Sequence, residues 1–333
     1  MSAAEAVTDG AGGPAAEFWL VVGTGLAGRR IVGELTDACE RLLTGRYKVV
    51  HTDELLLGVH GGRLTLHDLD GAPLAAPAVA YARMSSALLS TDREITLLRH
   101  LEAMGTVLLN PTGAVLACVN KFWHLQQLAV AGLPVPDTRS YADAPLAKVI
   151  DAGVPEPCVV KAVRGQQGRQ VFLAPDAAML RAVQGSLKDD SPYVFQRYVA
   201  HSHGRDLRVV VVDGRAVAAQ VRSAADGDLR SNLALGGTAE LCPGRYPAGE
   251  ELAVRAAEAL GLGVAGVDLL FEPDGGFTIC EVNVHVGWRA YMTEVAPAVV
   301  TACRARLDAV GGAGAGIGPG TGPGPVSGAG PVT

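Results

Sequence analysis

Two pairs of apolar runs in the second half of the chain, each pair joined by a short turn, constrain the fold more than any other sequence feature. Residues 206–212 and 215–222 flank Asp213-Gly214, a dipeptide that strongly indicates a two-residue β-hairpin. Residues 264–271 and 277–283 flank a second turn with the sequence EPDGG. Strands joined by tight turns pair side by side, so this half of the chain is predicted to form a β-sheet.

The first half of the chain alternates strands with helices. An apolar run at 18–25, a helical pattern at 29–43 and a strand at 47–53 predict a β-α-β unit. A small β-rich lobe is expected from residue 157, and the combined pattern predicts an α/β and α+β fold. The other expected helices span residues 92–105, 120–131, 176–187 and 249–260, and the other expected strands span 106–110, 157–163, 171–174 and 193–199.

Low-complexity sequence marks both ends of the chain. Residues 1–16 are rich in Ala and Gly, and residues 311–333 contain ten Gly and four Pro. We predict that both segments are disordered, because their composition cannot supply a packed core. The part between them is predicted to divide into three domains, at residues 17–112, 113–200 and 201–310.

Charge and composition narrow the partners that the chain can have. It has 28 basic and 34 acidic side chains, a formal net charge of −6 and only 5% aromatic residues. A dedicated nucleic-acid binder needs excess positive charge and stacking side chains, so that class is excluded and small-molecule partners are expected. The chain has no signal-peptide pattern and no apolar run of about 18 residues, so we expect a cytoplasmic protein that does not enter a membrane. The sequence leaves the oligomeric state open, a homo-oligomer included.

The second hairpin carries polar residues inside strongly apolar strands. Glu281 and Asn283 are two residues apart and share a face of their strand; Asp268 joins them there if opposed residue numbers sum to 549. Two carboxylates and an amide are hard oxygen donors that suit Mg²⁺, which fills its other positions with water and nucleotide phosphates. The hairpin is therefore predicted to bind a metal, rather than to expose these residues on an edge strand. The opposite face would carry the core residues Val267, Leu269, Cys280 and Val282.

Basic side chains elsewhere suggest that the protein holds anions. Lys161 ends an apolar strand and precedes a loop with glycines at 165 and 168, so its ammonium could reach a phosphate under that loop. Polar residues also surround the first hairpin, where arginines could bind oxyanions bidentately unless they form surface salt bridges. His285 stands close to the metal candidates in sequence and could line the same site. The group around the first hairpin comprises Arg205, Asp206, Arg208, Arg222, Arg230 and Asn232.

A glycine-rich motif near the N-terminus offers a competing function. The sequence GTGLAG at 23–28 follows a strand, opens a helix and precedes Asp53 by 25 residues, as in a dinucleotide fingerprint. Any tight strand-to-helix turn favours glycine, however, and the pattern changes after a single β-α-β unit. A nicotinamide-dependent oxidoreductase is therefore a weaker alternative.

Several longer motifs occur in a fixed order: CVNKFWHLQQLAVAGLPVPDT, CVVKAVRGQQGRQVFLA, VFQRYV, HGRDLRVVVVDG, SNLALGG, GVDLL and CEVNVHVG. This order resembles the RimK-like branch of the ATP-grasp ligases, particularly the N-acetylaspartylglutamate and β-citrylglutamate synthetases, from about residue 92 to residue 290. The resemblance implies an ATP-grasp fold, with an N-terminal Rossmann-like pre-ATP-grasp domain, a small central lobe and a C-terminal lobe. ATP would lie between the two lobes, and GTGLAG would bind no dinucleotide.

The resemblance also implies roles for single residues. Asp268, Glu281 and Asn283 would bind Mg²⁺ or Mn²⁺, with two ions expected, and Arg222 would be a catalytic contact of the phosphate or acyl phosphate. Beyond the motif CEVN the chain departs from the synthetases, and there His285 and Arg289 are candidate substrate residues together with Arg208 and Asn232. The implied ATP-binding residues are Lys121, Lys161, Gln196, Arg197, Tyr198, Val199, Asp206 and Arg222, and the segment from Gln196 to Asp206 would form the wall around the adenine and ribose.

The implied reaction is ATP-dependent formation of an amide bond. A carboxylate would be activated as an acyl phosphate, and the amino group of an amino acid such as glutamate would displace phosphate. The acid could be a small molecule, or the carboxylate of a peptide, a protein terminus or a natural product. A nucleotide sensor without catalysis is a further alternative, and the intact metal-binding residues argue against it.

Overall fold

The computed structural model describes residues 17–85, 89, 92–164, 171–187, 192–225, 227–229, 231 and 236–314. The predicted disorder of 1–16 and of 315–333 lies outside the described residues. So do the glycine loop after Lys161 and the candidate substrate residue Asn232.

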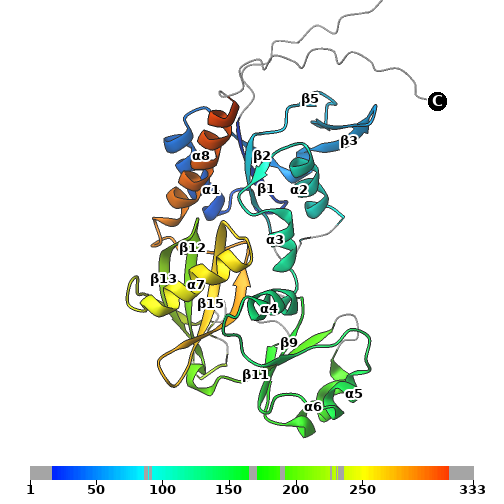
Figure 1. Ribbon diagram of the computed structural model, residues 1–333, viewed down its shortest axis with the longest axis vertical. Helices are drawn as coiled ribbons and strands as arrows, with labels where there is room; N and C mark the ends of the chain where they lie inside the picture. Colours follow the sequence, from blue (N-terminus) through cyan, green and yellow to red (C-terminus); the bar gives the residue numbers. More distant parts are fainter. Residues whose placement is uncertain are drawn as a thin grey trace, which may run out of the picture.

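The first part of the chain forms a parallel four-stranded sheet, called the N-terminal sheet below (Figure 1). Its two faces pack differently: Leu20 belongs to the buried cluster that contains α1 (Arg30–Leu43), whereas Val21 belongs to the cluster that contains α2 (Glu94–Ala103). The β-α-β unit predicted at the start of the chain is confirmed. In spatial order the strands are β2 (Tyr47–His51), β1 (Phe18–Val22), β6 (Val79–Arg83) and β7 (Val107–Leu108).

Several elements were not predicted from the sequence. The largest is an antiparallel sheet between β2 and β6, in which Leu66 is the single buried strand residue, so that its strands lack periodic burial. This sheet consists of β3 (Leu56–His60), β4 (Arg63–His67) and β5 (Pro73–Leu74). The other unpredicted elements are β6, α3 (Thr112–Ala117), β8 (Thr138–Arg139), α5 (Leu146–Asp151), β14 (Thr238–Leu241), α8 (Val295–Gly314) and short 3-10 helices at Thr52–Glu54, Gln184–Ser186 and Ala200–Ser202.

The middle of the chain forms an antiparallel sheet, called the central sheet below. Helices α5 and α6 (Ala177–Val183) bury Ile150 and Leu180 against it, together with Val160 and Phe195. The β-rich lobe expected from residue 157 is thus present. Its strands, in spatial order, are β10 (Val171–Ala174), β9 (Cys158–Ala162), β11 (Tyr193–Arg197) and β8.

The second half of the chain forms a five-stranded antiparallel sheet, called the C-terminal sheet below. Both predicted hairpins are present, and the first turns at Asp213 and Gly214, which have φ of 48° and 73°. Positive φ at both central residues suits the right-handed twist of the flanking strands, and explains the Asp-Gly sequence. The strand order is β14, β13 (Arg215–Ser223), β12 (Arg205–Val212), β15 (Val264–Phe271) and β16 (Phe277–Asn283).

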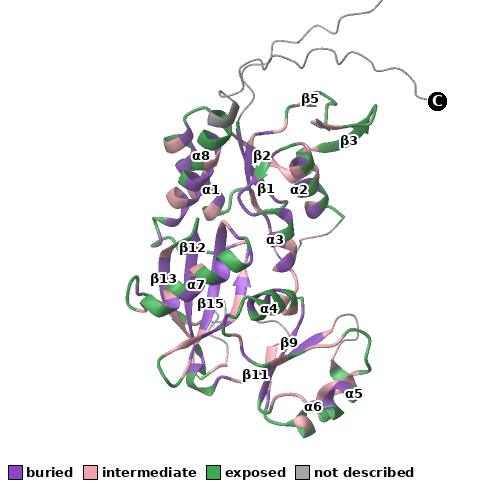
Figure 2. Ribbon diagram, in the orientation of Figure 1, coloured by how far each residue is buried: buried purple, intermediate pink, exposed green. Residues whose placement is uncertain are grey.

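The two faces of the C-terminal sheet have different neighbours. On one face Leu207, Val209 and Val267 pack against α7 (Pro247–Ala259), while α4 (Lys121–Val130) lies beside β16 (Figure 1). On the other face, Val210 and Val264 pack in the same buried cluster as β1 of the N-terminal sheet and the last helix, α8. Strands β12 and β15 of this sheet are accordingly among the most buried parts of the molecule (Figure 2).

Helix α8 corrects one sequence prediction. It runs to Gly314, so residues 311–314, which we predicted to be disordered, continue the helix. The reason is that helix extension costs little once a helix is anchored, and α8 buries Val299 and Cys303 beside α1. Among the described residues, no helix is long and apolar enough to cross a membrane.

Candidate active site

Polar residues from four strands of the C-terminal sheet lie in one row on the face opposite α7. Arg208 of β12 pairs with Gln220 of β13 on one side and with Asp268 of β15 on the other. Asp268 in turn pairs with Glu281 of β16, which is the register in which residue numbers sum to 549. Asn283 lies two residues farther along β16 on the same face. The predicted convergence of the three oxygen donors is therefore present.

Asp268 lies at the centre of this row and is buried. Its two carboxylate oxygens accept hydrogen bonds from Arg208 Nη1 at 2.8 and 3.0 Å, and Oδ1 lies 3.1 Å from Arg222 Nη2. Asn283 Nδ2 also donates to Asp268 Oδ2, at 3.3 Å. One carboxylate thus faces two guanidinium groups.

Arg222 is held in place by Asp206, its cross-strand neighbour. Arg222 Nε donates to Asp206 Oδ1 at 2.7 Å and Nη2 donates to Oδ2, so the contact is bidentate. Ser231 Oγ donates to the same carboxylate at 2.8 Å. Burial raises the pKa of Asp206, although the charge of Arg222 opposes it. Burial alone would lower the pKa of Arg222, but the carboxylates of Asp268 and Asp206 outweigh it and raise that pKa. Arg222 therefore keeps its charge and a fixed orientation.

Glu281 pairs with the first of two lysines, at the other end of the row. Lys121 Nζ donates to Glu281 Oε1 at 2.5 Å, from the first residue of α4. Burial alone would raise the pKa of Glu281, but the charge and hydrogen bond of Lys121, with help from Lys161, lower it to about 2. The carboxylate is therefore ionised at neutral pH and able to bind a cation.

Lys161 reaches the same place from the central sheet. Its Nζ donates to Gln196 Oε1 at 2.9 Å and lies 3.4 Å from Cys280 Sγ. Burial lowers the pKa of Lys161, but Cys280, Glu281 and Asp268 outweigh it, so that the pKa is raised. Two lysines from different elements therefore meet near Glu281.

The position of Cys280 corrects a second sequence prediction, because we expected this residue in the core on the opposite face. The register shifts between Asp268 and Leu269, where the partner changes from Glu281 to Ile279 and leaves Cys280 as an extra residue. A β-bulge of this kind interrupts the alternation of faces. The other residues expected in that core, Val267, Leu269 and Val282, are buried there.

The residues predicted to form an adenine wall lie where β11 leads into the C-terminal sheet. Arg197 Nη2 donates to Glu272 Oε1 at 2.8 Å, and Tyr198 Oη lies 2.6 Å from His203 Nδ1. Val199 is buried, and the Gln196 side chain points to Lys161. The segment is thus anchored at both of its ends, and its contact with adenine stays a prediction.

The candidate substrate residues are not equally placed. Arg208 lies within the polar row. His285 follows β16, and burial, with a smaller effect from the charge of Arg83, lowers the pKa of His285 to about 3. Arg289 is exposed in the segment before α8 and bonds to no described side chain. The structure does not bring Arg289 into the row.

Sequence reasoning missed two residues near this row, Gln220 and Arg83. Gln220 is buried opposite Arg208 and accepts a hydrogen bond from Tyr291 Oη at 2.9 Å, so the segment before α8 reaches the row through Tyr291. Arg83 ends β6, directly after an apolar run. A charged residue at the carboxyl end of a parallel strand is a recognisable signal, but that strand was not predicted.

The polar row suits a divalent cation that brings ligands of its own. Asp268, Glu281 and Asn283 offer two carboxylates and an amide oxygen, the donors that Mg²⁺ and Mn²⁺ prefer. In the described part of the chain, no cluster of three or more His, Cys, Asp or Glu side chains could hold a metal. The three residues therefore fit an ion whose remaining positions are filled by phosphate oxygens and water.

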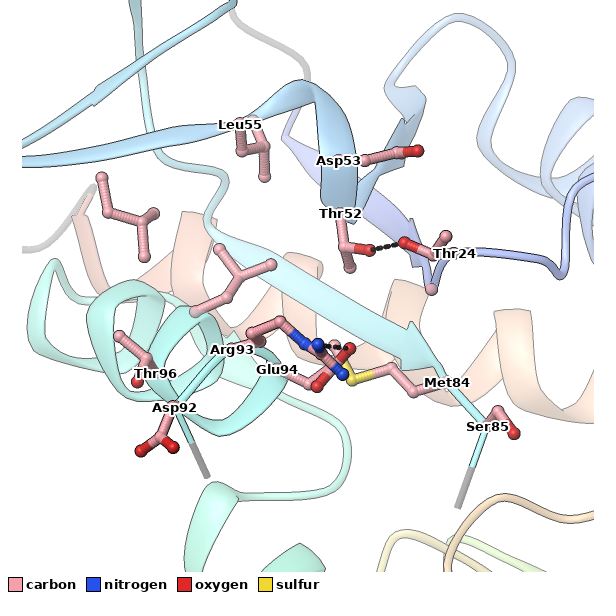
Figure 3. A pocket seen from close by; sticks show the side chains of 13 residues that line it. Thr24, Thr52, Asp53, Leu55, Met84, Ser85, Asp92, Arg93, Glu94 and Thr96 are labelled. Atoms are coloured by element: carbon pink, nitrogen blue, oxygen red, sulfur yellow. Dashed lines mark hydrogen bonds and ion pairs between the residues drawn. The ribbon is translucent and has the colours of Figure 1, made fainter. Parts of the chain in front are cut away.

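A separate cavity of about 420 Å³ opens at the carboxyl edge of the N-terminal sheet (Figure 3). Gly23, Thr24 and Asp53, the residues of the dinucleotide-like motif, line it together with Met84 and Arg93. Because β6 alternates faces, Met84 points into this cavity whereas Arg83 points to the other side of the sheet. The cavity is thus distinct from the polar row.

Comparisons with known proteins agree with this geometry. Residues 118–299 match the model of the RimK-like ATP-grasp domain. The chain is 41% identical to N-acetylaspartylglutamate synthase A of Mus musculus over 79% of its own length and 69% of that protein. It is 43% identical to β-citrylglutamate synthase B of Homo sapiens over 76% of its length and 66% of that protein. It therefore spans about two thirds of the length of these relatives.

The fold has a counterpart among solved structures. The ATP-grasp ligase PsnB, in complex with a minimal precursor, Mg and ADP, superposes with a TM-score of 0.63 at 20% identity. The superposition covers 87% of this chain and 98% of that one. This likeness shows the ATP-grasp fold.

Proposed function

Because the chain belongs to the RimK-like ATP-grasp family, we propose that it is a ligase that uses ATP to join the amino group of glutamate to a small acid, releasing ADP and phosphate. The observation that carries this proposal is the row in which Arg208 and Arg222 share Asp268 beside Glu281. Both relatives quoted above are named for products that contain glutamate, which supports glutamate as the amine.

The nucleotide is proposed to lie between the central and C-terminal sheets. Lys121 and Lys161 approach Glu281 from two different elements and would hold the phosphates as point charges. The segment from Gln196 to Val199 joins the two sheets and would line the adenine. This arrangement also supports the proposed division into domains at 17–112, 113–200 and 201–310.

The first step is transfer of a phosphoryl group. A carboxylate oxygen of the acid attacks the γ-phosphorus, the bond from that phosphorus to the β–γ bridging oxygen breaks, and ADP departs. The reactants are both anionic, so their approach requires fixed positive charge. Arg222, oriented by its bidentate contact with Asp206, and Arg208 supply that charge.

The second step forms the amide. The uncharged amino nitrogen attacks the acyl carbon, the bond from carbon to the phosphate oxygen breaks, and the departing phosphate takes the amine proton. Arg222 remains beside the phosphate during this step, because Asp206 and Ser231 hold it in one orientation. The same residue thus stabilises charge in both steps.

Asp268, Glu281 and Asn283 would hold Mg²⁺ or Mn²⁺, which when bound neutralises phosphate charge and orients the γ-phosphoryl group. Before any ligand binds, Lys121 and the two arginines neutralise these carboxylates. Arg208 and Arg222 would then turn part of their charge toward the acid.

The test is amide formation by the purified protein. ATP, glutamate and either Mg²⁺ or Mn²⁺ are incubated with citrate, N-acetylaspartate and other di- and tricarboxylates, and ADP and products are measured by mass spectrometry. Glu281→Ala is the inactive variant, and Glu251→Ala, an exposed carboxylate on α7, is the matched control.

An amide product that disappears in Glu281→Ala but not in Glu251→Ala would support the proposal and identify the acid. ATP binding without turnover on any small acid would contradict the small-acid assignment and would point to a peptide, a protein terminus or a sensor. Absence of ATP binding would contradict the function as a whole.

A further inference from the structure

Arg83 is a partly buried cation that the mechanism above leaves unused. It ends β6, and its guanidinium carbon lies 5.9 Å from the centre of the Trp288 ring. Its Nη1 is buried and has no hydrogen-bond partner in the described part of the chain. Burial, and after it the charge of Arg208, lower the pKa of Arg83, while Tyr81 opposes them.

The charges around Arg83 do not balance. The charge of Arg208, which also acts on Arg83, is positive. The carboxylates in and beside the polar row are bound to other cations: Asp206 to Arg222, Asp268 to Arg208 and Arg222, and Glu281 to Lys121. No described carboxylate forms an ion pair with Arg83. Because a buried charge without a partner is destabilising, the position favours a ligand that brings a negative charge.

Arg83 also lies where the N-terminal part meets the polar row. Tyr81, two residues earlier on the same face of β6, belongs to the buried cluster that includes Val210 and Val286 of the C-terminal part. On β12, Val210 is followed toward the row by Arg208, two residues away on the same face. The apolar border between the N-terminal and C-terminal parts therefore ends at Arg83 on β6 and at Arg208 on β12.

A second unpartnered polar atom lies at this border. His285 Nε2, two residues beyond Asn283, is buried without a hydrogen-bond partner among the described residues. Gly266 has no Cβ, and an added Cβ would lie 2.6 Å from Arg208 Nη2. Two guanidinium groups and an imidazole, all able to donate hydrogen bonds, are therefore available on this side of the row.

We propose that Arg83, from the N-terminal part of the chain, binds a substrate carboxylate that does not react, with Arg208 and His285 beside it. This inference rests on the proposed ligase function and adds a specificity residue to it. The carboxylate belongs either to the acid, as a second carboxylate besides the activated one, or to the amino acid, as its α-carboxylate. Both are planar anions that a guanidinium group binds through two parallel hydrogen bonds.

The test compares Arg83→Met with the unchanged protein. Methionine keeps an unbranched apolar chain over Trp288 and removes the charge, and because Nη1 has no partner, the melting temperature should stay the same or rise. KM for the substrate that Arg83 binds should rise by about ten- to a hundredfold, the range for a lost charged hydrogen bond. KM for ATP should change less than twofold.

Two further variants separate binding from structure. Arg83→Lys keeps the charge without the planar fork, and should give a KM between those of the unchanged protein and Arg83→Met. Arg63→Met removes an exposed arginine at the start of β4, far from the row, and should leave every KM unchanged. A rise in KM for citrate or N-acetylaspartate assigns Arg83 to the acid, and a rise for glutamate assigns it to the amino acid.

Unchanged KM values for both substrates in Arg83→Met would overturn the inference while leaving the ligase function standing. If the unchanged protein forms no amide, calorimetric titration with citrate, N-acetylaspartate and glutamate in the presence of ATP and Mg²⁺ replaces the KM measurement. Binding that weakens tenfold or more in Arg83→Met but not in Arg63→Met would then support the inference, and equal or absent binding would overturn it.

Discussion

At the scale of the residue, the site depends on how closely side chains approach the C-terminal sheet. Gly266 of β15 illustrates this, because an added Cβ would lie 2.6 Å from Nη2 and 3.1 Å from Cζ of Arg208. Arg208 can occupy its place beside Asp268 only if position 266 carries no side chain. The glycine is therefore required by packing of the polar row and not by backbone conformation.

Gly266→Ala should consequently impair activity more than stability. The guanidinium is the far end of a flexible side chain, so it can move aside, but a displacement of about 1 Å in a catalytic group can reduce the rate by roughly a hundredfold. We expect kcat/KM to fall at least tenfold, with a melting temperature within a few degrees of the unchanged protein. Gly113→Ala, where an added Cβ meets nothing within 4 Å, is the control. Equal activity in both variants would contradict this account.

His124 is the residue that should make the protein sensitive to acid. It is buried in α4, neither ring nitrogen has a partner among the described residues, and burial lowers its pKa to about 4. Below pH 6.5 the unfolded chain binds a proton at this position that the folded chain does not. Stability from this group is therefore complete above pH 6.5 and is lost as the pH falls from 6.5 to 4.

His124→Phe should remove this dependence. Between pH 7 and pH 4, protonation of His124 should lower the free energy of unfolding of the unchanged protein by roughly 3 kcal/mol, because each unit of pKa difference corresponds to about 1.4 kcal/mol. The variant should not show this loss. The measurement is the free energy of unfolding by urea at pH 7, 5.5 and 4. His60→Phe, an exposed histidine on β3, should keep the dependence of the unchanged protein. If the free energy of unfolding falls with pH as steeply in His124→Phe as in His60→Phe, other groups cause the acid sensitivity.

At the scale of the element, the first hairpin sets the register of the polar row. Its turn requires positive φ at Asp213 and Gly214, and Asp213 Oδ1 also accepts a hydrogen bond from Arg306 of α8 at 2.8 Å. From this turn the strands run back through a register shift between Val210 and Val211, which leaves Val217 as an extra residue and places Arg222 opposite Asp206. The turn and the bulge together therefore position the charged side chains at the other end of the hairpin.

Gly214→Ala should destabilise the protein by about 1 kcal/mol, because an L-residue with φ of 73° is strained. Gly33→Ala makes the same chemical change inside α1, in open space and at ordinary helical φ, and should stabilise the protein by up to about 1 kcal/mol. Chemical denaturation of the two variants checks both signs. Destabilisation by Gly33→Ala, or none by Gly214→Ala, would contradict the interpretation.

At the scale of the whole molecule, the last helix connects the two ends of the fold. Helix α8 follows the C-terminal sheet in sequence but packs against α1, and its Val299 and Val300 lie in one buried cluster with Leu20 of β1 and Val210 of β12 (Figure 1). The N-terminal sheet and the C-terminal sheet therefore share a core. That shared core is what keeps Arg83 beside the polar row.

A chain that ends after residue 294 should accordingly lose both sheets' common core. Without α8 the apolar face of β1 and α1 would be exposed, and we expect a lower melting temperature, aggregation and loss of activity. A chain that ends after residue 314 keeps all of α8 and should melt and react like the full chain. Differential scanning calorimetry and size-exclusion chromatography of both truncations check this. An unchanged melting temperature in the shorter chain would show that α8 is dispensable.

The sequence alone determined the features that local chemistry controls. Turn residues, apolar alternation and helix periodicity were enough to place both hairpins, the β-α-β unit and helices α4 and α7, because each depends on neighbours within a few residues. The pairing of Asp268 with Glu281 was predicted on the condition that opposed residue numbers sum to 549, and the bulge at Cys280 produces that register. Longer motifs indicated the family, which the comparisons confirm.

Only the tertiary structure decided which distant residues meet. The bulge that turns Cys280 toward Lys161, the contact of α8 with α1 and the approach of Arg83 to Arg208 join segments far apart in the chain. No local pattern encodes such contacts, because burial of apolar surface is not directional and its free energy depends on the area covered and not on the sequence separation of the partners. Charged residues become a site when that packing brings them to one place.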